Sequence, residues 1–267
     1  MAEITAGTVK ALREETGLGM MDCKKALEES GGDMAAAKDI LRKKGLTTAE
    51  KKAHRATSEG LIAISVNDDR TSAAMIEVRC ETDFCARNDE FRSMVNSLAK
   101  TARAAQDGEI SMTEQMHQDL QDCLAKIGEN MSYARGVKIS AERVGTYVHH
   151  NGKVGVLVGV NGRITDQTLA DLCMHIAFAD PIGITGKDIP AELVEREKRI
   201  AKEQAIESGK PPEIADKMVI GKVNKFLAAN SLLEQPFVRD DKKKVKDILG
   251  GASVTAFARF AVGAEND

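Results

Sequence analysis

The sequence predicts an α+β protein with a helical N-terminal region, a core of antiparallel sheets and helices, and a protruding antiparallel pair of helices. Three observations predict this class. Apolar residues recur at helical spacing as far as Gly45, they form short strand-like runs between helical segments after Gly60, and they become sparse in a strongly charged segment between residues 190 and 228.

The composition limits what the chain can be. Its 267 residues, 42% of them hydrophobic, suffice for about two domains with buried cores. A net charge of −3 and an aromatic content of 3% argue against a general nucleic-acid binder, which needs a basic surface or rings for base stacking. The five cysteines have no CxxC spacing, the N-terminus has no apolar signal region, and no run is long enough to span a membrane. We therefore expect a cytoplasmic protein.

Residues 1–46 predict a domain of three short helices. Each helical segment has an amphipathic pattern and is bounded by glycines or by a capping aspartate: Ile4–Gly17, Met21–Ser30 and Asp33–Gly45. Residues 47–59 are polar and have poor apolar periodicity. This stretch is interpreted as a linker to the core, either irregular or helical.

Residues 60–142 predict the first half of the core, subdomain N. The apolar period changes from helical to alternating at Gly60, and a hairpin is followed by helices and one more strand. In order, the elements are strands Leu61–Val66 and Ala74–Cys80, helices Asn88–Ala102 and Ser111–Ile127, and strand Met131–Ser140.

Residues 143–189 and 229–267 repeat this order loosely and predict subdomain C, so the core has the pattern of an internal duplication. Residues 190–228 contain two charged helical stretches around the breaker Ser208–Pro212 and predict a coiled-coil helical hairpin inserted in subdomain C. Such an arm is more typical of docking or dimerisation than of a core. The remaining elements of subdomain C are strands Val144–Val148 and Val154–Val160, helix Asp166–Ala179 and strand Val254–Val262.

No constellation in the sequence indicates catalysis. There is no GxxxxGK(S/T) phosphate loop, no GxSxG and no HExxH motif. The adjacent pair His149–His150 has no ligand companions at metal spacing, and neighbours on a strand point to opposite faces. Cys80 and Cys85 flank a polar loop, where two reduced thiols are favoured over a redox pair. We expect a protein that acts by binding, is not an enzyme and needs neither metal nor cofactor.

Three stretches carry a family resemblance: TGLGMMDCKKAL at Thr16–Leu27, ETDFCARN at Glu81–Asn88 and KIGEN at Lys126–Asn130. In this order and at these separations, they resemble the bacterial elongation factor Ts family. The runs QPFV at Gln235–Val238 and VTAFARF at Val254–Phe260 are also similar to that family. The resemblance covers essentially the whole chain. Many members continue into a further helical module after the last core strand, which we expect to be absent here.

The resemblance implies a guanine nucleotide exchange factor that binds the GDP-bound GTPase elongation factor Tu and promotes release of GDP. It implies an N-terminal domain similar to ubiquitin-associated domains, two related α+β halves and a coiled-coil arm. It implies no direct binding of nucleic acid or membrane. The assemblies compatible with it are a one-to-one complex and a dimer of heterodimers.

By similarity, one set of residues contacts the GTPase domain of the partner: Met20, Met21, Lys24, Ile127, Gly128 and His149. Adjacent methionines at a helix start cannot both face one core, so at least one is expected at the surface, where methionine suits an adaptable contact. The plain alternatives are a solvated Lys24 on a charged helix and Gly128 as a helix C-cap with Ile127 packed beneath it. The turn after His149 is one residue longer than the family pattern.

By the same similarity, Thr82, Asp83, Phe84 and Cys85 displace magnesium in the partner, with the Asp-Phe pair entering between helices of the GTPase. The plain alternative is that Asp83 caps the following helix and Phe84 staples it to the core. Cys85 replaces a small aliphatic residue, which free cysteine can mimic.

Two other functions compete with nucleotide exchange. The first is a non-catalytic adaptor that uses the ubiquitin-associated-like bundle and the coiled-coil arm. An adaptor has no need of the Asp83–Phe84 pair between strand and helix. The second is a nucleic-acid-binding translation protein that uses Lys242–Lys244. That run is short and follows Asp240 and Asp241, which is more typical of a solvated face.

Overall fold

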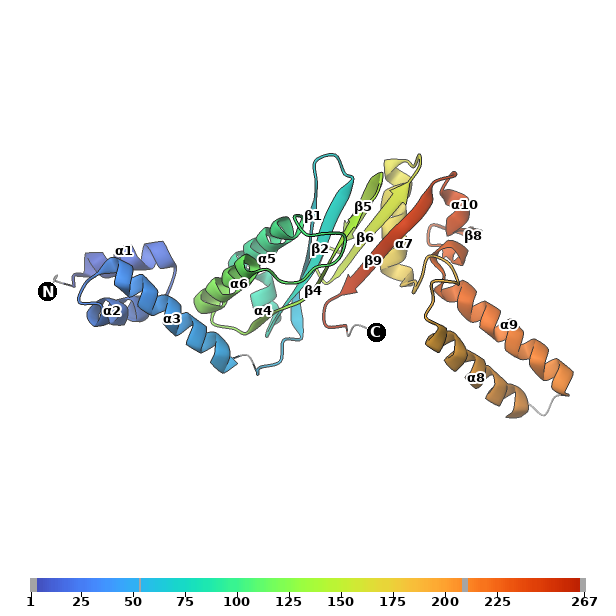
Figure 1. Ribbon diagram of the computed structural model, residues 1–267, viewed down its shortest axis with the longest axis horizontal. Helices are drawn as coiled ribbons and strands as arrows, with labels where there is room; N and C mark the ends of the chain where they lie inside the picture. Colours follow the sequence, from blue (N-terminus) through green and yellow to red (C-terminus); the bar gives the residue numbers. More distant parts are fainter. Residues whose placement is uncertain (1–3, 53, 208–210, 265–267) are drawn as a thin grey trace.

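The computed structural model describes residues 4–52, 54–207 and 211–264 and confirms the α+β class (Figure 1). The N-terminal helices are α1 (Ala6–Thr16), α2 (Met20–Glu29) and α3 (Met34–Lys52). They enclose a small core that includes Leu12 and Leu27. In Figure 1 this bundle lies at one end of an elongated molecule, and α3 extends from it towards the sheets.

The third helix does not end at Gly45, because α3 continues to Lys52, so the first part of the predicted linker is helical. A Cβ added to Gly45 would lie 3.3 Å from the Cβ of Ala125 on a core helix. The glycine therefore permits close packing of α3 against the core and does not end the helix. The predicted cap was correct: Asp33 Oδ1 accepts hydrogen bonds from the amides of Ala35 and Ala36 at 2.8 and 3.0 Å.

The first half of the core is a four-stranded antiparallel sheet in the order β1-β2-β4-β3. Three helices pack on this half, α4 and α5 directly against β1 and β2. The fully buried Phe91 is among the largest side chains of their common core. The elements are β1 (Glu59–Val66), β2 (Ser72–Cys80), α4 (Asp83–Arg87), α5 (Asp89–Ala102), β3 (Gly108–Glu109), α6 (Glu114–Ile127) and β4 (Met131–Ser140).

The second half repeats the order of three of these strands in a three-stranded antiparallel sheet, without a counterpart of β3 among the described residues. Its sheet, in the order β5-β6-β9, places the second strand of a hairpin between the first strand and the last strand of the half. This is how β2 lies between β1 and β4 in the first half. The elements are β5 (Arg143–Val148), β6 (Val154–Asn161), α7 (Asp166–Ala179) and β9 (Ser253–Ala261).

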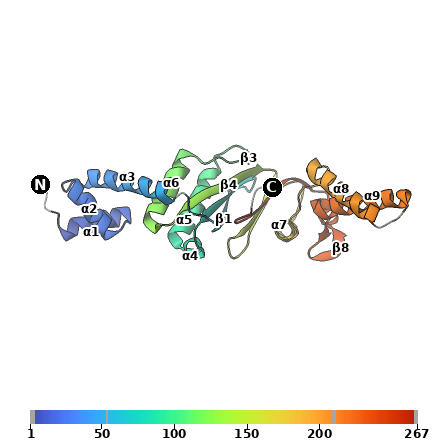
Figure 2. The same cartoon turned by 90° about the horizontal axis from the view of Figure 1, so that it is seen from below.

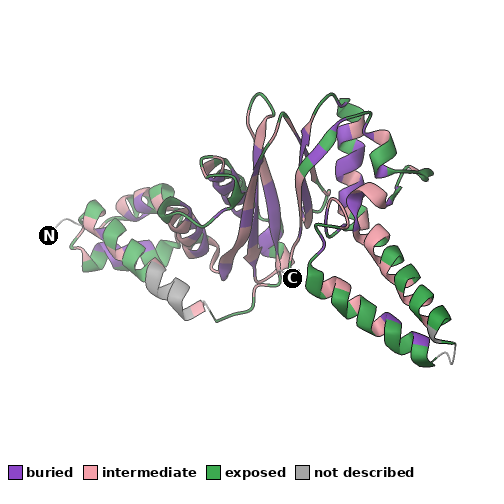
Figure 3. Cartoon of the chain, turned by 45° about the vertical axis from the view of Figure 1, so that its right-hand side comes forward, coloured by how far each residue is buried: buried purple, intermediate pink, exposed green. Residues whose placement is uncertain are grey.

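The two sheets pack against each other through a second apolar layer, while the helices cover their outer faces (Figure 3). Ile62 and Met75 come from the first sheet, and Leu157 and Phe260 come from the second. A Cβ added to Gly155 of β6 would lie 2.4 Å from Cγ2 of Ile62, so glycine is needed for this close approach.

The predicted arm is present as α8 (Ala191–Glu207) and α9 (Pro212–Asn230), which lie side by side and protrude from the core (Figures 1 and 2). Ala201 and Ala205 are buried on α8. Four short elements at the base of the arm have no counterpart in the sequence prediction: η1 (Leu232–Glu234), β7 (Pro236–Phe237), β8 (Asp240–Lys244) and α10 (Val245–Ile248). None of the helices in the described part of the chain has the length and apolar character needed to cross a bilayer.

Candidate partner-binding surface

Phe84 lies on α4, a helix of one turn that begins directly after β2. Its side chain is 80% exposed, whereas the neighbouring Cys85 is buried in the first-half core. The N-cap of α4 is Thr82, whose Oγ1 accepts a hydrogen bond from the Cys85 amide at 3.2 Å. The alternative in which Asp83 caps this helix and Phe84 staples it is therefore wrong. Asp83 instead forms an ion pair with Arg87 at 3.1 Å.

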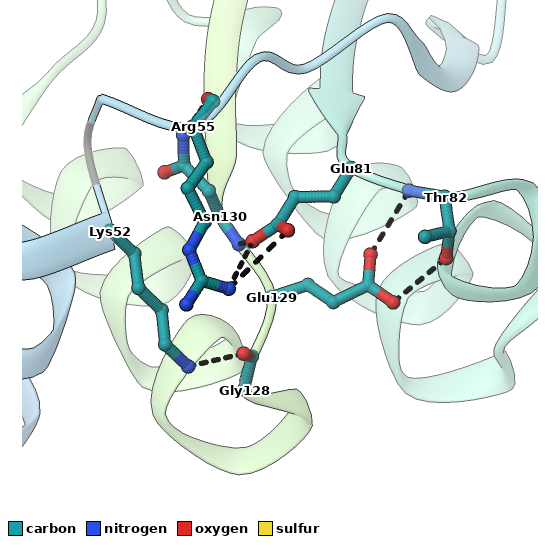
Figure 4. Close-up of polar contacts among 7 residues, drawn as sticks. All are labelled: Lys52, Arg55, Glu81, Thr82, Gly128, Glu129 and Asn130. Atoms are coloured by element: carbon teal, nitrogen blue, oxygen red, sulfur yellow. Dashed lines mark hydrogen bonds and ion pairs between the residues drawn. The ribbon is translucent and has the colours of Figure 1, made fainter.

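Two glutamates connect the start of α4 to the loop that follows α6, as Figure 4 shows. Glu129 accepts hydrogen bonds from the amide and the hydroxyl of Thr82, at 3.0 and 2.7 Å. In return, Glu81 accepts the amide of Asn130 at 2.6 Å. We call these four residues the clasp. It joins two of the stretches that carry the resemblance, and we find no pattern in the sequence that predicts it.

The loop after α6 begins at Gly128, which has φ +84° and ends the helix with a hydrogen bond from its amide to the Leu124 carbonyl at 2.7 Å. A positive φ favours glycine, and the C-cap interpretation is confirmed. Ile127 is partly buried against the first-half core. The carbonyl of Gly128 accepts a hydrogen bond from Lys52 at the end of α3.

The segment after α3 is also tied to the clasp. Arg55 forms an ion pair with Glu81 at 3.3 Å, and its carbonyl accepts a hydrogen bond from Asn130 Nδ2 at 2.7 Å. Sequence reasoning missed Lys52 and Arg55, because a polar stretch with little periodicity gives no indication of its partners. The chain between the N-terminal helices and the core is thus attached at several points to the surface that carries Phe84.

Hydrogen bonds and burial shift the pKa of one clasp glutamate and of two nearby thiols. The hydrogen bond from the Asn130 amide lowers the pKa of Glu81, which favours the carboxylate. The pKa of Cys80 is raised, first by its contact with the thiol of Cys85 and then by burial. Burial raises the pKa of Cys123 to about 12. A raised pKa favours the protonated thiol, which is a poor nucleophile. Cys80 and Cys85 are both buried and are not joined by a disulfide.

On the N-terminal bundle, α2 presents the predicted methionines to solvent. Met20 is 41% exposed and Met21 is 61% exposed, while Cys23 and Leu27 face the small core. The expectation that at least one methionine is exposed is confirmed for both. Lys24 lies on the same helix with Glu28 at 3.8 Å, both largely exposed.

His149 lies at the turn between β5 and β6 and is half-buried. Its Nδ1 is hydrogen bonded to the Tyr147 hydroxyl at 2.7 Å. The turn rests on the start of β1, where the Ile62 amide donates to the Gly152 carbonyl at 2.9 Å. Because Glu59 at this end of β1 pairs with Cys80 of β2, His149 lies at the end of the sheets from which α4 starts.

Within the described residues, no three His, Cys, Asp or Glu side chains are grouped so that they could hold a metal ion. The site is a surface: an exposed aromatic ring on a firmly anchored one-turn helix, with a glycine-ended helix beside it. Such an arrangement has the features of a contact surface for another protein.

The family model described as elongation factor TS matches residues 81–264. The chain is similar to elongation factor Ts of Aquifex aeolicus, with 44% identity over 279 residues covering 96% of each chain. It is also similar to elongation factor Ts of Hahella chejuensis (43% identity, 98% of this chain and 93% of the relative) and of Desulfovibrio desulfuricans (41% identity, 99% of this chain and all of the relative). The chain therefore belongs to the elongation factor Ts family, whose members are translation elongation factors.

Proposed function

We propose that this chain is the guanine nucleotide exchange factor of elongation factor Tu, binding the GDP-bound GTPase and promoting release of GDP. The observation that carries the proposal is Phe84, whose ring is 80% exposed although its helix is anchored on both sides. A large apolar ring in water has a free energy to gain from burial, about 1.5–3 kcal/mol for a phenylalanine side chain. When a partner protein buries the ring, this free energy is gained on binding and can offset the cost of distorting the partner's structure.

The proposed target of that distortion is the magnesium and phosphate site of the GTPase. A magnesium ion bound to a nucleoside diphosphate neutralises the charge of the phosphates and demands near-ideal octahedral geometry. A ring that enters between neighbouring helices displaces the groups around the ion, and GDP then loses part of its electrostatic attraction. Thr82, Asp83, Phe84 and Cys85 form the element that enters, and the chain itself performs no covalent chemistry.

The remaining predicted residues supply docking contacts in this proposal. Met20, Met21 and Lys24 reach the GTPase domain from the N-terminal bundle, Ile127 and Gly128 from beside α4, and His149 from the second half. Binding through several separate surfaces of one chain limits the orientations in which the Phe84 ring can meet the partner. The proposal includes no direct contact with nucleic acid or membrane.

The test is stopped-flow release of a fluorescent GDP analogue from elongation factor Tu, with excess unlabelled GDP, with and without this protein. A release rate that rises with protein concentration and then saturates supports exchange. Binding to the GTPase in a pull-down with an unchanged release rate would contradict the proposal and favour the adaptor function.

A further inference from the structure

We propose that Glu129 is the positioning residue of the Phe84 helix: its carboxylate, fixed at the end of α6, sets the direction in which Phe84 points. Glu129 does not act on the partner in this inference; it acts through Thr82 and α4. The kinetic consequence rests on the proposed function, whereas the structural consequence can be measured on this protein alone.

The short helix α4 cannot hold its own conformation. It spans only Asp83–Arg87, and a single turn fixes several backbone dihedrals for very few hydrogen bonds. Burial of Cys85 and Ala86 holds one side of the turn against the core. Apolar contacts of that kind are not directional, so they leave the orientation of the start of the helix to polar contacts.

Glu129 supplies directional contacts at the start of α4. One of its oxygens accepts the Thr82 amide at 3.0 Å and the other accepts the Thr82 hydroxyl at 2.7 Å. The same hydroxyl oxygen accepts the Cys85 amide at 3.2 Å. Hydrogen bonds to an ionised acceptor are stronger than neutral ones, and two from one residue define its orientation. A continuous chain of bonds thus runs from Glu129 into the first turn of α4.

Glu129 is itself held in place by its neighbours in the chain. It follows Gly128, whose left-handed conformation reverses the chain at the end of α6. On its other side, Asn130 is tied to Glu81 at 2.6 Å and to the Arg55 carbonyl at 2.7 Å. The carboxylate is therefore attached to a fourteen-residue helix, and through it α4 takes its position from α6.

The chemistry predicts a graded series of variants. Glu129→Ala removes both hydrogen bonds to Thr82. Glu129→Gln can keep two uncharged ones, because its amide oxygen can accept the Thr82 amide and its amide nitrogen can donate to the hydroxyl oxygen. We therefore expect the loss of local order in α4, and of exchange activity, to be large in the alanine variant and small in the glutamine variant.

The structural test uses the absence of tryptophan from the sequence. Phe84→Trp introduces the only tryptophan, at the second residue of α4, which can be excited selectively over the two tyrosines of the sequence. Time-resolved anisotropy then reports its local motion. In this background, Glu129→Ala should increase the amplitude of the fast anisotropy decay. Glu129→Gln should leave the amplitude close to that of Phe84→Trp alone. The matched control is Glu234→Gln, which alters a carboxylate whose two oxygens pair with Lys244 and Lys246 at the base of the arm. An unchanged decay in a folded Glu129→Ala protein would overturn the inference, whatever the function of the chain.

The kinetic test is a double-mutant cycle with Phe84→Ala, measured as GDP release from elongation factor Tu. Glu129→Ala should lower the maximal release rate by about tenfold or more, with the half-saturating concentration little changed. In the Phe84→Ala background the same substitution should have no further effect, because there is no ring left to position. Effects that multiply would show that Glu129 acts independently of Phe84 and would overturn the inference.

Failure of the proposed function would look different. If the unmodified protein does not accelerate GDP release, the cycle has no rate to compare and nucleotide exchange is wrong. The anisotropy series then still decides the positioning role. Thermal melting of every variant by circular dichroism confirms that each measurement is made on folded protein.

Discussion

The Phe84→Ala variant tests whether the Phe84 ring acts on the partner or stabilises the fold of this protein. Phe84 is 80% exposed, so only about a fifth of its side chain is removed from water in the free protein. Full burial of a phenylalanine stabilises by about 1.5–3 kcal/mol, so the loss expected here is about 0.3–0.6 kcal/mol. For a chain of this size, that corresponds to a fall in Tm of about 1–2 °C.

Phe91 provides the matched control, since it lies one helix further on and is fully buried in the same half of the core. Phe91→Ala deletes the same atoms but leaves a cavity, and such changes cost about 3–5 kcal/mol. The expected fall in Tm is about 6–20 °C. The two variants therefore differ about tenfold in their cost to stability for an identical chemical change.

The assay pairs melting by circular dichroism with GDP release at a temperature at which both variants are folded. We expect Phe84→Ala to melt almost like the unmodified protein and to lose most of its exchange activity. Phe91→Ala should melt early and exchange normally per folded molecule. Coupling between two ligands of one protein is reciprocal, so the Phe84→Ala complex should also be less sensitive to added GDP. The reasoning would be refuted by a large fall in the Tm of Phe84→Ala together with unchanged exchange per folded molecule.

Three further predictions follow from the sequence and the fold. The sequence has no phosphate loop, so calorimetry with GDP and GTP at high protein concentration should show no heat of binding, and a saturable isotherm would contradict this. Because α8 packs along α9 outside the core, replacing residues 191–224 with a short linker should leave cooperative unfolding intact; a broad, non-cooperative melt would show that the arm is part of the core. Burial lowers the pKa of His175, so the unfolded chain takes up this proton at a higher pH than the folded one. Stability from this group is complete above about pH 6.5 and falls as the pH decreases towards the folded pKa, by at most about 1.4 kcal/mol per pH unit. The free energy of unfolding can be measured by urea titration at several pH values between 7 and 5.5. His175→Gln should reduce its dependence on pH, and an unchanged dependence would show that another group is responsible.

The regular elements could be predicted because each carries a repeated pattern over many residues. Such a pattern is present in the two strands of the first hairpin, in the long core helices and in the charged arm. The helix α3 was misjudged at Gly45, since a glycine that ends a helix and one that lets two helices approach look the same in a sequence. The short strands β3, β7 and β8 have two to five residues, too few to show a period.

The candidate site was predictable only in part. Exposure of Phe84 depends on which face of a one-turn helix the core covers, and one turn has no periodicity to indicate that face. The bond between Glu129 and Thr82 joins positions 47 apart in the chain. Glu129 and Asn130 belong to a stretch that carries the family resemblance, but the resemblance assigned them no role. Contacts between a side chain and a distant backbone leave no pattern in the intervening residues.

The apolar layer between the two sheets also has a consequence for the order in which the protein can be completed on the ribosome. Ile62 and Met75 are synthesised early, whereas Phe260, which covers the same layer, belongs to the last strand. Between β6 and β9 the ribosome must make α7, the arm and the elements at its base. At about 5–20 residues per second, the first sheet waits several seconds with its inner face incompletely covered. Apolar surface that is exposed during this interval favours aggregation, and a chain with a shorter arm should expose it for a shorter time.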